Sequence, residues 1–284
     1  PEVEALALDL TNKLAGRAIV KVHVAQFSAL KTYDPPLSAL EGGLVEGVSR
    51  HGKFLDIEAA GLHAVLHLAR AGWVRWRDEV PTLPPRPSPK STLAARIVLD
   101  DGSGLDITEA GTKKSLALYV VRSPGDVEGI ARLGPDPLAA AFTPEVLQGI
   151  LAAAGRAQIK GVLRHQGTIA GIGNAYSDEL LHAAKLSPFK PANSLNPAEF
   201  EVLFDAIKSV LGDAVERSRG LAASELKGEK KSNLAVHGKK GQKCPVCGDV
   251  VREVSFADSA LQYCATCQTG GKPLADRRMS RLLK

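Results

Sequence analysis

Cysteine is rare in this sequence and confined to one short segment. The chain of 284 residues has four cysteines, and all of them lie within 24 residues, at Cys244, Cys247, Cys264 and Cys267. No cysteine is left over to pair with a distant segment. We therefore expect a reducing compartment and one local task that the four residues perform together.

Long hydrophobic runs are missing as well. No apolar run reaches the roughly 18 residues that a membrane span needs, and no basic, apolar and then small-residue leader precedes the first helical pattern. The sequence has no internal repeats. With 24% charged and 44% hydrophobic residues, it has the composition of a globular protein. We expect a cytoplasmic monomer of two or three domains, with no membrane contact.

Positive charge is unevenly distributed along the chain. The formal net charge is +5 at pH 7. From Val215 onward, 14 Lys and Arg stand against 7 Asp and Glu, a net of +7, and the rest of the chain has a net of −2. A module that faces a polyanion has such a distribution. A solvated tail has it too, so charge alone leaves both interpretations open.

The hydrophobic period changes along the chain. Apolar residues at helical spacing predict an amphipathic helix over residues 1–15. Short alternating segments between residues 18 and 121 predict an antiparallel sandwich or barrel. After "LGPDPL" (133–138) the period becomes helical. The basic stretch 217–243, which contains Gly and Ser, is predicted to be a flexible loop.

Two helix starts are marked in the helical part. Thr143 and Asn196 each precede a proline, with an acid in the first turn. Side chains of this kind cap helices, and proline suits the first helical position. We expect a helix to begin directly after each of them.

The cysteines have the spacing C-x2-C-x16-C-x2-C. Each C-x2-C turn places two thiolates within reach of one tetrahedral ion, and the stretch between the pairs is typical of a β-hairpin. Metal bonding would organise a segment that is too small to fold by burial alone. We therefore expect one structural Zn²⁺ held by the four cysteines. Two disulfides are the alternative.

Two further stretches could bind phosphate. "AGIGNAYSDELL" puts glycines just ahead of a helix that Asn174 could begin, and the N–H groups of a helix start suit an anion. Lys160 and Arg164 would add charge from the preceding helical segment. "VSRHGKFLDIE" places Lys53 just before a hydrophobic strand. Ordinary helix capping and a solvated lysine are the alternatives.

These motifs occur in a characteristic order. They are "PEVE", "RHGKFL", "HLARAGW", "LGPDPL", "QIKGVLRHQGTIAGIGNAYSDELLHAAKLSPF", "VHGKKGQKCPVCG" and "YCATCQ", and they extend over nearly the whole chain. Together they resemble one family, the formamidopyrimidine-DNA glycosylase/endonuclease VIII family of bifunctional DNA repair enzymes. The Gly–Asn turn before a helix, followed by a four-cysteine finger, is specific to that family.

The resemblance implies an α+β protein. Its parts would be an N-terminal antiparallel β-sandwich flanked by helices (1–124), a linker (125–137), a helix-two-turn-helix domain (138–223), and a basic loop, zinc-finger β-hairpin and basic tail (224–284). Double-stranded DNA with an oxidised base or an abasic site would cross the cleft between the domains. The protein would then be associated with the nucleoid in the cytoplasm.

The resemblance also implies a reaction. The family flips its lesion out of the duplex, because the sugar C1′ is inaccessible in the stack. The nitrogen of an N-terminal proline attacks C1′, the base leaves, and a Schiff base forms. β,δ-Elimination of the flanking phosphates follows, with an adjacent glutamate as general acid–base. A terminal amine suits this task because its pKa lies well below that of lysine.

Site residues follow by position. Lys53 and Asn174 match family residues that hold the phosphates beside the damaged nucleotide, and Lys53 is also assigned to the catalytic set with Pro1 and Glu2. Lys160 is assigned to DNA binding. Phosphate contacts of this kind set the register on the duplex and make binding depend on salt.

The start of the chain departs from the family pattern. The family terminus has the pattern P-E-L-P-E-V-E, and the spacing to Gly16 and Lys53 aligns Pro1 with its second proline. Glu2 would then match a supporting acid, and the catalytic pair would lie three residues upstream, roughly 10 Å of extended chain away. Either the sequence lacks its first residues, which we favour, or Pro1 and Glu2 act as a displaced catalytic pair.

Two DNA-contacting loops depart from the family as well. Ser259 occupies the position of an arginine that grips phosphates, and serine lacks the charged fork. Arg70 replaces a methionine that fills the void left by the flipped base. The second void-filling loop has Lys113 and Lys114 near it but no Arg–Phe wedge. Arg252 or the basic tail (Arg277, Arg278 and Arg281) could compensate for Ser259.

Two functions follow from these features. The first is a DNA glycosylase with AP-lyase activity on oxidised bases, whether formamidopyrimidine, 8-oxoguanine or oxidised pyrimidines. The second is a catalytically impaired protein that binds damaged DNA on the same scaffold, which the start of the chain and Ser259 motivate. The sequence does not identify the preferred lesion or the base opposite it.

Overall fold

The computed structural model describes residues 1–81, 83–85, 88, 91–256 and 259–275. Contacts within the chain define two compact units. The first contains Pro1–Arg132 and Ser218–Gly228, and the second contains Leu133–Arg217 and Glu229–Lys284. The chain thus returns from the second unit to the first over residues 218–228, and then goes back. The domain boundaries expected from the sequence stay predictions.

The first unit begins with α1 (Glu2–Leu14). Leu6, Leu10 and Leu14 recur every four residues and are 0–1% exposed, so one face of the helix enters the core. Beyond the helix, Gly16 adopts a φ of +79°, which is favourable only for glycine. The helix predicted over residues 1–15 is confirmed.

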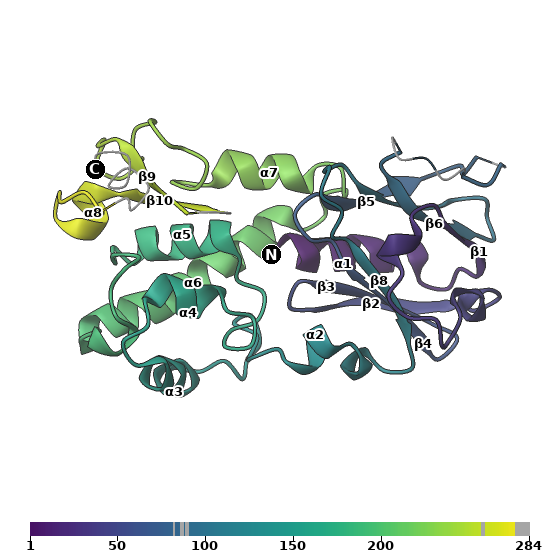
Figure 1. Ribbon diagram of the computed structural model, residues 1–284, viewed down its shortest axis with the longest axis horizontal. Helices are drawn as coiled ribbons and strands as arrows, with labels where there is room; N and C mark the ends of the chain where they lie inside the picture. Colours follow the sequence, from purple (N-terminus) through teal and green to yellow (C-terminus); the bar gives the residue numbers. More distant parts are fainter. Residues whose placement is uncertain (82, 86–87, 89–90, 257–258, 276–284) are drawn as a thin grey trace. The chain divides into compact units, whose positions relative to one another are not determined.

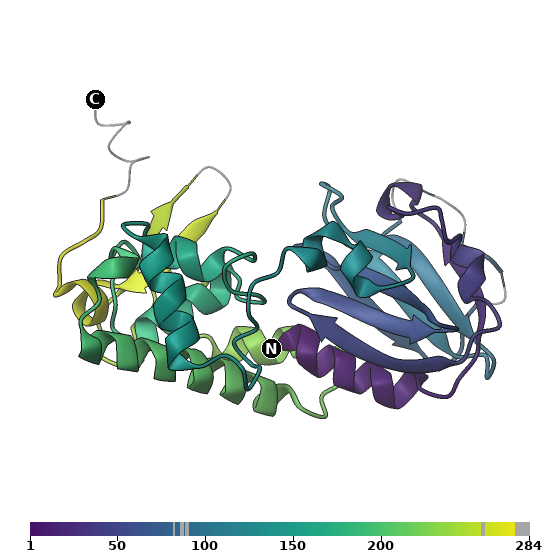
Figure 2. The same cartoon turned by 90° about the horizontal axis from the view of Figure 1, so that it is seen from below.

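Two four-stranded antiparallel sheets follow α1 (Figure 1). One has the order β1 (Ile19–Val24), β6 (Leu93–Leu99), β7 (Gly104–Glu109), β5 (Gly72–Arg77), and the other has the order β2 (Val45–His51), β3 (Phe54–Ala59), β4 (Leu62–His67), β8 (Ala117–Val121). Apolar residues of α1 and of both sheets form a single core cluster. This is the expected antiparallel β-sandwich flanked by helices, and Figure 2 shows α1 running alongside it.

The outer face of the second sheet is covered rather than exposed. The short segments η3 (Pro124–Asp126) and α2 (Glu128–Ala131) follow β8, and Val127 packs there with Val65 and Val121 in a second small cluster. Residues of β3 therefore point either into the main core or beneath this cover. For this reason Asp56, at the centre of β3, is only 2% exposed.

The second unit is helical before its last hairpin. It contains α3 (Pro144–Ala154), α4 (Ile159–Arg164), α5 (Asn174–Ala183) and α6 (Pro197–Ser218), whose final residue lies in the first unit. Both predicted helix starts are confirmed. Thr143 caps α3 by accepting the N–H of Val146. Asn196 and Glu199 exchange hydrogen bonds of 2.9 and 3.0 Å at the start of α6, a capping box.

The cysteine segment ends the described chain. It contains β9 (Val251–Ser255), β10 (Ala260–Cys264) and α8 (Ala265–Thr269). β9 and β10 pair in antiparallel register, from Ala260 opposite Ser255 to Cys264 opposite Val251. The expected hairpin between the two C-x2-C pairs is confirmed. Among the described residues, no helix is long and apolar enough to cross a membrane.

The expected flexible loop at 217–243 contains a helix, and that prediction was wrong in this respect. α7 (Leu226–Asn233) begins in the first unit and ends in the second. Its start is fixed by tertiary contacts: Leu226 is fully buried, and the Lys227 ammonium lies 4.6 Å from the ring centre of Trp73. Trp73 Nε1 donates to the carbonyl of Ala223 at 2.7 Å. The basic composition of the segment gave no sign of these contacts.

Candidate functional site

Pro1 and Glu2 form a terminal amine–carboxylate pair. The nitrogen of Pro1 lies 4.0 Å from Glu2 Oε2, and the two side chains are 6% and 14% exposed. The carbonyl of Pro1 accepts the N–H of Ala5 at 3.0 Å, which closes the first turn of α1. The pair can exchange a proton through one intervening water. An acid in the first turn of a helix also suits the helix dipole by itself.

An ion pair connects this helix start to the β2–β3 turn. Arg50 at the end of β2 pairs with Glu4 of α1 and donates to the carbonyl of Gly52 at 3.0 Å. Gly52 has a φ of +58°, so the turn depends on glycine. The next residue is Lys53. Within the first unit, the helix that begins with Pro1 and Glu2 and the turn that carries Lys53 are therefore held together.

A buried carboxylate organises the strands beside Lys53. Asp56 accepts from His51 Nε2 at 3.0 Å and from His63 Nδ1 at 3.1 Å. His67 packs against Phe54 with ring centres 4.7 Å apart, and its burial, with the nearby charge of Lys53, lowers its pKa. Sequence reasoning missed this cluster. Strand alternation places Asp56 off the main core, but the covering of that face is a tertiary feature.

The glycine turn lies in the second unit and is shaped by Gln166. The Gln166 side chain donates to the carbonyls of Arg164 and Ile172 at 2.9 and 2.7 Å and accepts the N–H of Gly171 at 2.9 Å. Gly171 requires glycine, because its φ is +84°. α5 begins at Asn174, as predicted. The N–H groups of a first helical turn have no acceptor within the helix, and such a turn suits an anion.

The side chain of Asn174 faces the finger hairpin. Its Nδ2 donates to the carbonyl of Ala260 at 2.7 Å. Its Oδ1 is buried and has no hydrogen-bond partner among the described residues. The carbonyl of Ala260 in β10 thus holds one of the two N–H donors of this amide.

Lys160 is buried, which the sequence did not suggest. It is 5% exposed, pairs with Asp178 Oδ1 at 2.5 Å, and donates to Ser177 Oγ at 2.8 Å and to the carbonyl of Asn174 at 3.3 Å. Burial lowers the pKa of Lys160, and the charge of Asp178 opposes this shift. The ammonium therefore braces the first turn of α5.

Two acids of α5 attach the finger segment to the helix. Asp178 Oδ2 accepts from His237 Nδ1 at 2.7 Å and from the N–H of Gln262 at 3.2 Å. Glu179 accepts three backbone N–H groups, those of Ala235, Val236 and His237, at 2.7 to 2.9 Å. Sequence reasoning missed these roles. The signal in the sequence was a pair of adjacent acids, Asp178 and Glu179, in a helix that otherwise has few charged residues.

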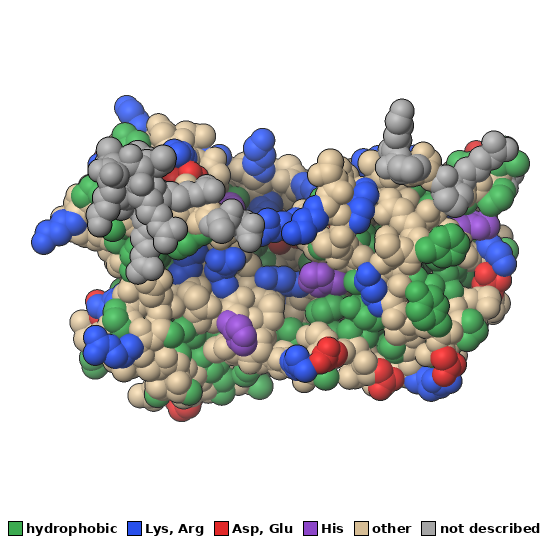
Figure 3. Space-filling view, viewed as in Figure 1, with side chains coloured by type: hydrophobic (Ala, Val, Ile, Leu, Met, Phe, Trp, Pro, Cys, Tyr) green, Lys and Arg blue, Asp and Glu red, His purple; other side chains and the backbone are tan. Residues whose placement is uncertain are grey.

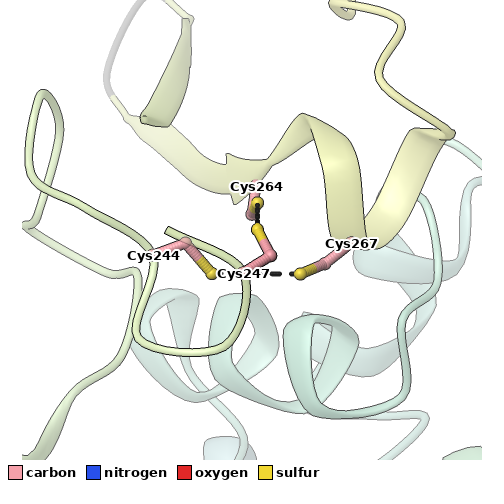
Figure 4. Close-up of side chains that lie close together, drawn as sticks. All are labelled: Cys244, Cys247, Cys264 and Cys267. Atoms are coloured by element: carbon pink, nitrogen blue, oxygen red, sulfur yellow. Dashed lines mark hydrogen bonds between the residues drawn. The ribbon is translucent and has the colours of Figure 1, made fainter. Parts of the chain in front are cut away.

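The four cysteines converge on one point (Figure 4). Their sulfur atoms all lie within 4.8 Å of one another, and all four thiols are free of disulfides. Cys247 Sγ and Cys264 Sγ are 3.3 Å apart, and Cys244 Sγ and Cys267 Sγ are 3.9 Å apart. Thiolates around one tetrahedral ion lie roughly 3.8 Å apart. The cluster therefore fits a single metal ion held by four sulfurs.

Proton affinity differs within this cluster. Burial raises the pKa of Cys264 and of Cys267. Burial opposes ionisation of Cys244 too, but hydrogen bonds from the backbone N–H groups of Cys247 and Val246 outweigh it and lower the pKa of Cys244. The N–H of Asp249 lowers the pKa of Cys247. The first C-x2-C turn is thus already arranged for thiolates.

The residues of the loops expected to contact DNA are exposed or half-buried. Arg70 is exposed in the β4–β5 turn, and Lys114 donates to the carbonyl of Glu109 at 2.6 Å. Ser259 is half-buried beside β10, and its carbonyl accepts the N–H of Phe256 at 2.7 Å. Arg252 is exposed on β9. The tail residues Arg277, Arg278 and Arg281 lie outside the described residues.

The structure thus groups the predicted residues by unit. Pro1, Glu2, Lys53 and Arg70 belong to the first unit, and Lys160, Asn174, Ser259 and the four cysteines belong to the second. In Figure 3, Lys and Arg side chains are visible on each of the two units. The fold and site define a two-unit protein with a metal-binding finger.

Three family models match the chain in order. They are the formamidopyrimidine-DNA glycosylase N-terminal domain (residues 1–112), the formamidopyrimidine-DNA glycosylase H2TH domain (133–225) and the zinc finger found in FPG and IleRS (241–270). The expected helix-two-turn-helix domain and zinc-finger domain are thereby confirmed. The α+β fold class is confirmed as well.

Curated relatives agree with these matches. A formamidopyrimidine-DNA glycosylase of Symbiobacterium thermophilum is 35% identical over 98% of this chain and 92% of its own length. An uncharacterized formamidopyrimidine-DNA glycosylase-like protein of Mycobacterium tuberculosis is 60% identical over 54% of this chain and 94% of its own length. The chain belongs to the formamidopyrimidine-DNA glycosylase family.

Solved structures have the same fold. The MutM (FPG) protein of Thermus thermophilus has a TM-score of 0.79 at 30% identity, and the match covers 96% of this chain and 99% of that one. A Lactococcus lactis formamidopyrimidine-DNA glycosylase, bound non-covalently to DNA with an AP site, has a TM-score of 0.81 at 25% identity and covers 95% and 98%.

Proposed function

We propose that this chain is a base-excision-repair DNA glycosylase with AP-lyase activity, and that it removes oxidised bases from duplex DNA. One observation carries the proposal. The first turn of α1, the helix that follows the proline amine and acid in the family, is ion-paired through Glu4 and Arg50 to the turn that presents Lys53. A nucleophilic amine, a proton-transfer group and a phosphate-binding cation are the three groups that such a reaction needs.

The reaction assigns a role to each group. The amine attacks C1′ of the flipped nucleotide, the bond from C1′ to the base breaks, and a Schiff base remains. The carboxylate then moves protons during β,δ-elimination of the flanking phosphates. Lys53 holds one of these phosphates, and the helix-start N–H groups at Asn174 hold another. Lys160 keeps the Asn174 turn in place through its contacts inside the second unit.

The finger completes the proposal. We propose that the four cysteines bind one structural Zn²⁺, because thiolates suit zinc and four of them leave no open position for catalysis. The partner would be double-stranded DNA with an oxidised base or an abasic site. The protein would act as a monomer in the cytoplasm, associated with the nucleoid. Lesion choice would depend on Arg70 and on the loop with Lys113 and Lys114.

A second candidate function is the binding of damaged DNA without turnover. It is favoured by Ser259, which offers a hydroxyl where the family has an arginine. Both functions predict salt-dependent binding to DNA, so turnover must separate them.

Borohydride trapping tests the amine directly. The chain is incubated with a duplex that has one abasic site, and borohydride reduces any Schiff base to a stable covalent adduct. An adduct on the terminal peptide would identify Pro1 as the nucleophile. No adduct with this chain, but one after Pro-Glu-Leu is added before Pro1, would place the nucleophile upstream. No adduct and no strand cleavage in either form would leave the binding function.

A further inference from the structure

A histidine from α5 reaches the cysteine cluster. His182 lies in the last turn of α5 and is 5% exposed. Its Nε2 is 3.2 Å from Cys244 Sγ, and Cys244 is 2% exposed. Neither group is explained by the reaction proposed above. A buried polar side chain that contacts a metal-binding sulfur can act on the metal site through that contact.

The direction of this hydrogen bond follows from the chemistry of sulfur. A thiolate has no proton and can only accept, so His182 Nε2 must carry the hydrogen and donate it. Hydrogen bonds to a charged acceptor are stronger than those between neutral groups. Groups that contact metal ligands in this way orient them, and their loss typically weakens metal binding.

The remaining contacts of α5 make this hydrogen bond part of a longer attachment. From its first residue onward, α5 contacts the finger through Asn174 and Ala260, Asp178 and Gln262, and Glu179 and the segment 235–237. Figure 1 shows α5 beside β10. His182 adds the last contact, and it is the one that ends on a metal-binding atom. The helix with the phosphate turn at one end therefore touches the metal site at the other.

We propose that His182 is a positioning residue for the metal site, and that its Nε2–H donates a hydrogen bond to the Cys244 thiolate. This bond fixes the orientation of Cys244 and keeps its sulfur bound to the metal. It also connects metal binding to α5, and so to the Asn174 turn. The inference rests on the zinc assignment made under Proposed function, and it adds to that assignment a residue outside the four ligands.

The alternative role for His182 is that of a direct zinc ligand. A histidine nitrogen can itself bind zinc, and His182 could replace Cys244 to give a site of three sulfurs and one nitrogen. In that case Nε2 would have no hydrogen to donate. The four sulfurs already lie within 4.8 Å of one another, which favours the four-sulfur site.

The test compares three variants with the wild-type protein. His182→Phe removes the donor but fills the space, and His182→Gln keeps an N–H donor at a similar reach. His23→Phe, on β1 of the first unit, is the matched control. Zinc content of the purified wild-type protein is measured first. If it contains no zinc, the zinc assignment fails, whatever the variants show.

Zinc release to a coloured chelator is then followed. We expect His182→Phe to release zinc about 10- to 100-fold faster than wild type. His182→Gln should stay close to wild type, and His23→Phe should be unchanged. Wild-type release by a folded, zinc-loaded His182→Phe variant would overturn the inference. So would a cobalt-loaded wild-type spectrum of three sulfurs and one nitrogen, because His182 would then be a ligand.

A measurement without substitution covers the case in which His182→Phe does not fold. In the cadmium-loaded wild-type protein, a scalar coupling between ¹¹³Cd and the His182 Hε2 proton would show the hydrogen bond to the metal-bound sulfur. A slowly exchanging Hε2 proton with no coupling to the metal would count against it. DNA affinity of the zinc-loaded variants serves as an additional readout of the connection to Asn174.

Discussion

The sandwich of the first unit and the finger segment of the second unit are stabilised in different ways. The sandwich of the first unit has one large apolar core, to which α1 and both sheets contribute. The finger of the second unit has two small clusters, and its attachment to α5 depends on Asp178, Glu179, His182 and four cysteines. A short segment cannot bury enough apolar surface to fold alone, so polar contacts and a metal take the place of a core.

The proposed functional groups of the two units lie in different surroundings. The sandwich places its proposed reacting groups at a helix start and a tight turn, both anchored in an apolar core. The second unit places its phosphate turn at the start of α5, which contributes Leu180 and Leu181 to the helical core and is joined to the finger by buried charges. Damage to the polar network should therefore affect DNA binding before it affects the sandwich.

Metal removal should have the largest effect and should be confined to the finger. Chelation, or Cys264→Ser, should unfold β9, β10 and α8, because structural zinc contributes about 10–16 kcal/mol in small fingers. Hydrogen exchange read by mass spectrometry should show loss of protection over residues 241–270 and none in β3 and β4. Added Zn²⁺ should restore the chelated protein. Loss of protection throughout the sandwich would contradict the difference between the units.

Lys160→Met should have the next largest effect. It leaves the buried Asp178 carboxylate without its charged partner, and breaking a buried ion pair typically costs about 3–5 kcal/mol. Chemical denaturation should show the loss in the second unit only. Lys272→Met, at an exposed lysine, is the control and should change the free energy of unfolding little. Equal losses in the two variants would mean that the ion pair is not a stabilising element.

Leu66→Ala tests the core of the first unit. Leu66 is fully buried in β4, and truncation of such a leucine costs about 2–5 kcal/mol because a cavity remains. The loss should appear as a lower denaturation midpoint of the sandwich with unchanged zinc content. Leu8→Ala is the matched control, since Leu8 is 39% exposed on α1. A finger that loses zinc in Leu66→Ala would show that the two units do not unfold independently.

Acid should weaken the first unit through Asp106. Burial alone would raise the pKa of this carboxyl, but hydrogen bonds from Arg96 and Arg77 outweigh it and lower the pKa. A carboxyl with a lowered pKa stabilises the fold above its ordinary pKa of about 3.9, and this contribution disappears as the pH falls below that value. Between pH 5 and pH 2, the free energy of unfolding of the sandwich should fall less in Asp106→Asn than in the wild-type protein, as measured by chemical denaturation at each pH. Asp100→Asn, at an exposed turn, should retain the wild-type slope.

Ser259→Arg should have the smallest effect, and it should strengthen binding to DNA. A restored charged contact to phosphate is worth at most about 1.5–3 kcal/mol, and it should make the salt dependence steeper by about one phosphate. Titration of a duplex with one abasic site at several salt concentrations measures both. Ser28→Arg adds the same charge in the first unit and controls for net charge. The same gain in both variants would exclude a local contact at the finger.

Local signals in the sequence were sufficient for much of this structure. The helix of residues 1–15, the starts of α3 and α6, the β9–β10 hairpin and the convergence of the cysteines all depend on spacing, caps or turns within a few residues. Each of these signals lies within one short segment, so it can be recognised without knowledge of how distant segments pack. They also located the Gly171–Asn174 turn at the start of α5.

Other features needed distant parts of the chain. Lys160 looked like a cation available to phosphate, but Asp178 and Ser177 enclose it from the next helix. Residues 226–233 looked like a basic loop, and they are helical with Leu226 and Lys227 packed against the first unit. No local pattern predicts which elements will cover a side chain.

The sequence by itself determined the family, the order of the parts and the cluster of four cysteines. These depend on residue type and spacing, which the chain carries directly. The tertiary structure alone decided that Asp56 is buried between two histidines, that Asn174 faces Ala260, and that His182 meets Cys244. Burial and hydrogen-bond pairing arise from elements far apart in the chain, and they exist only after those elements have packed.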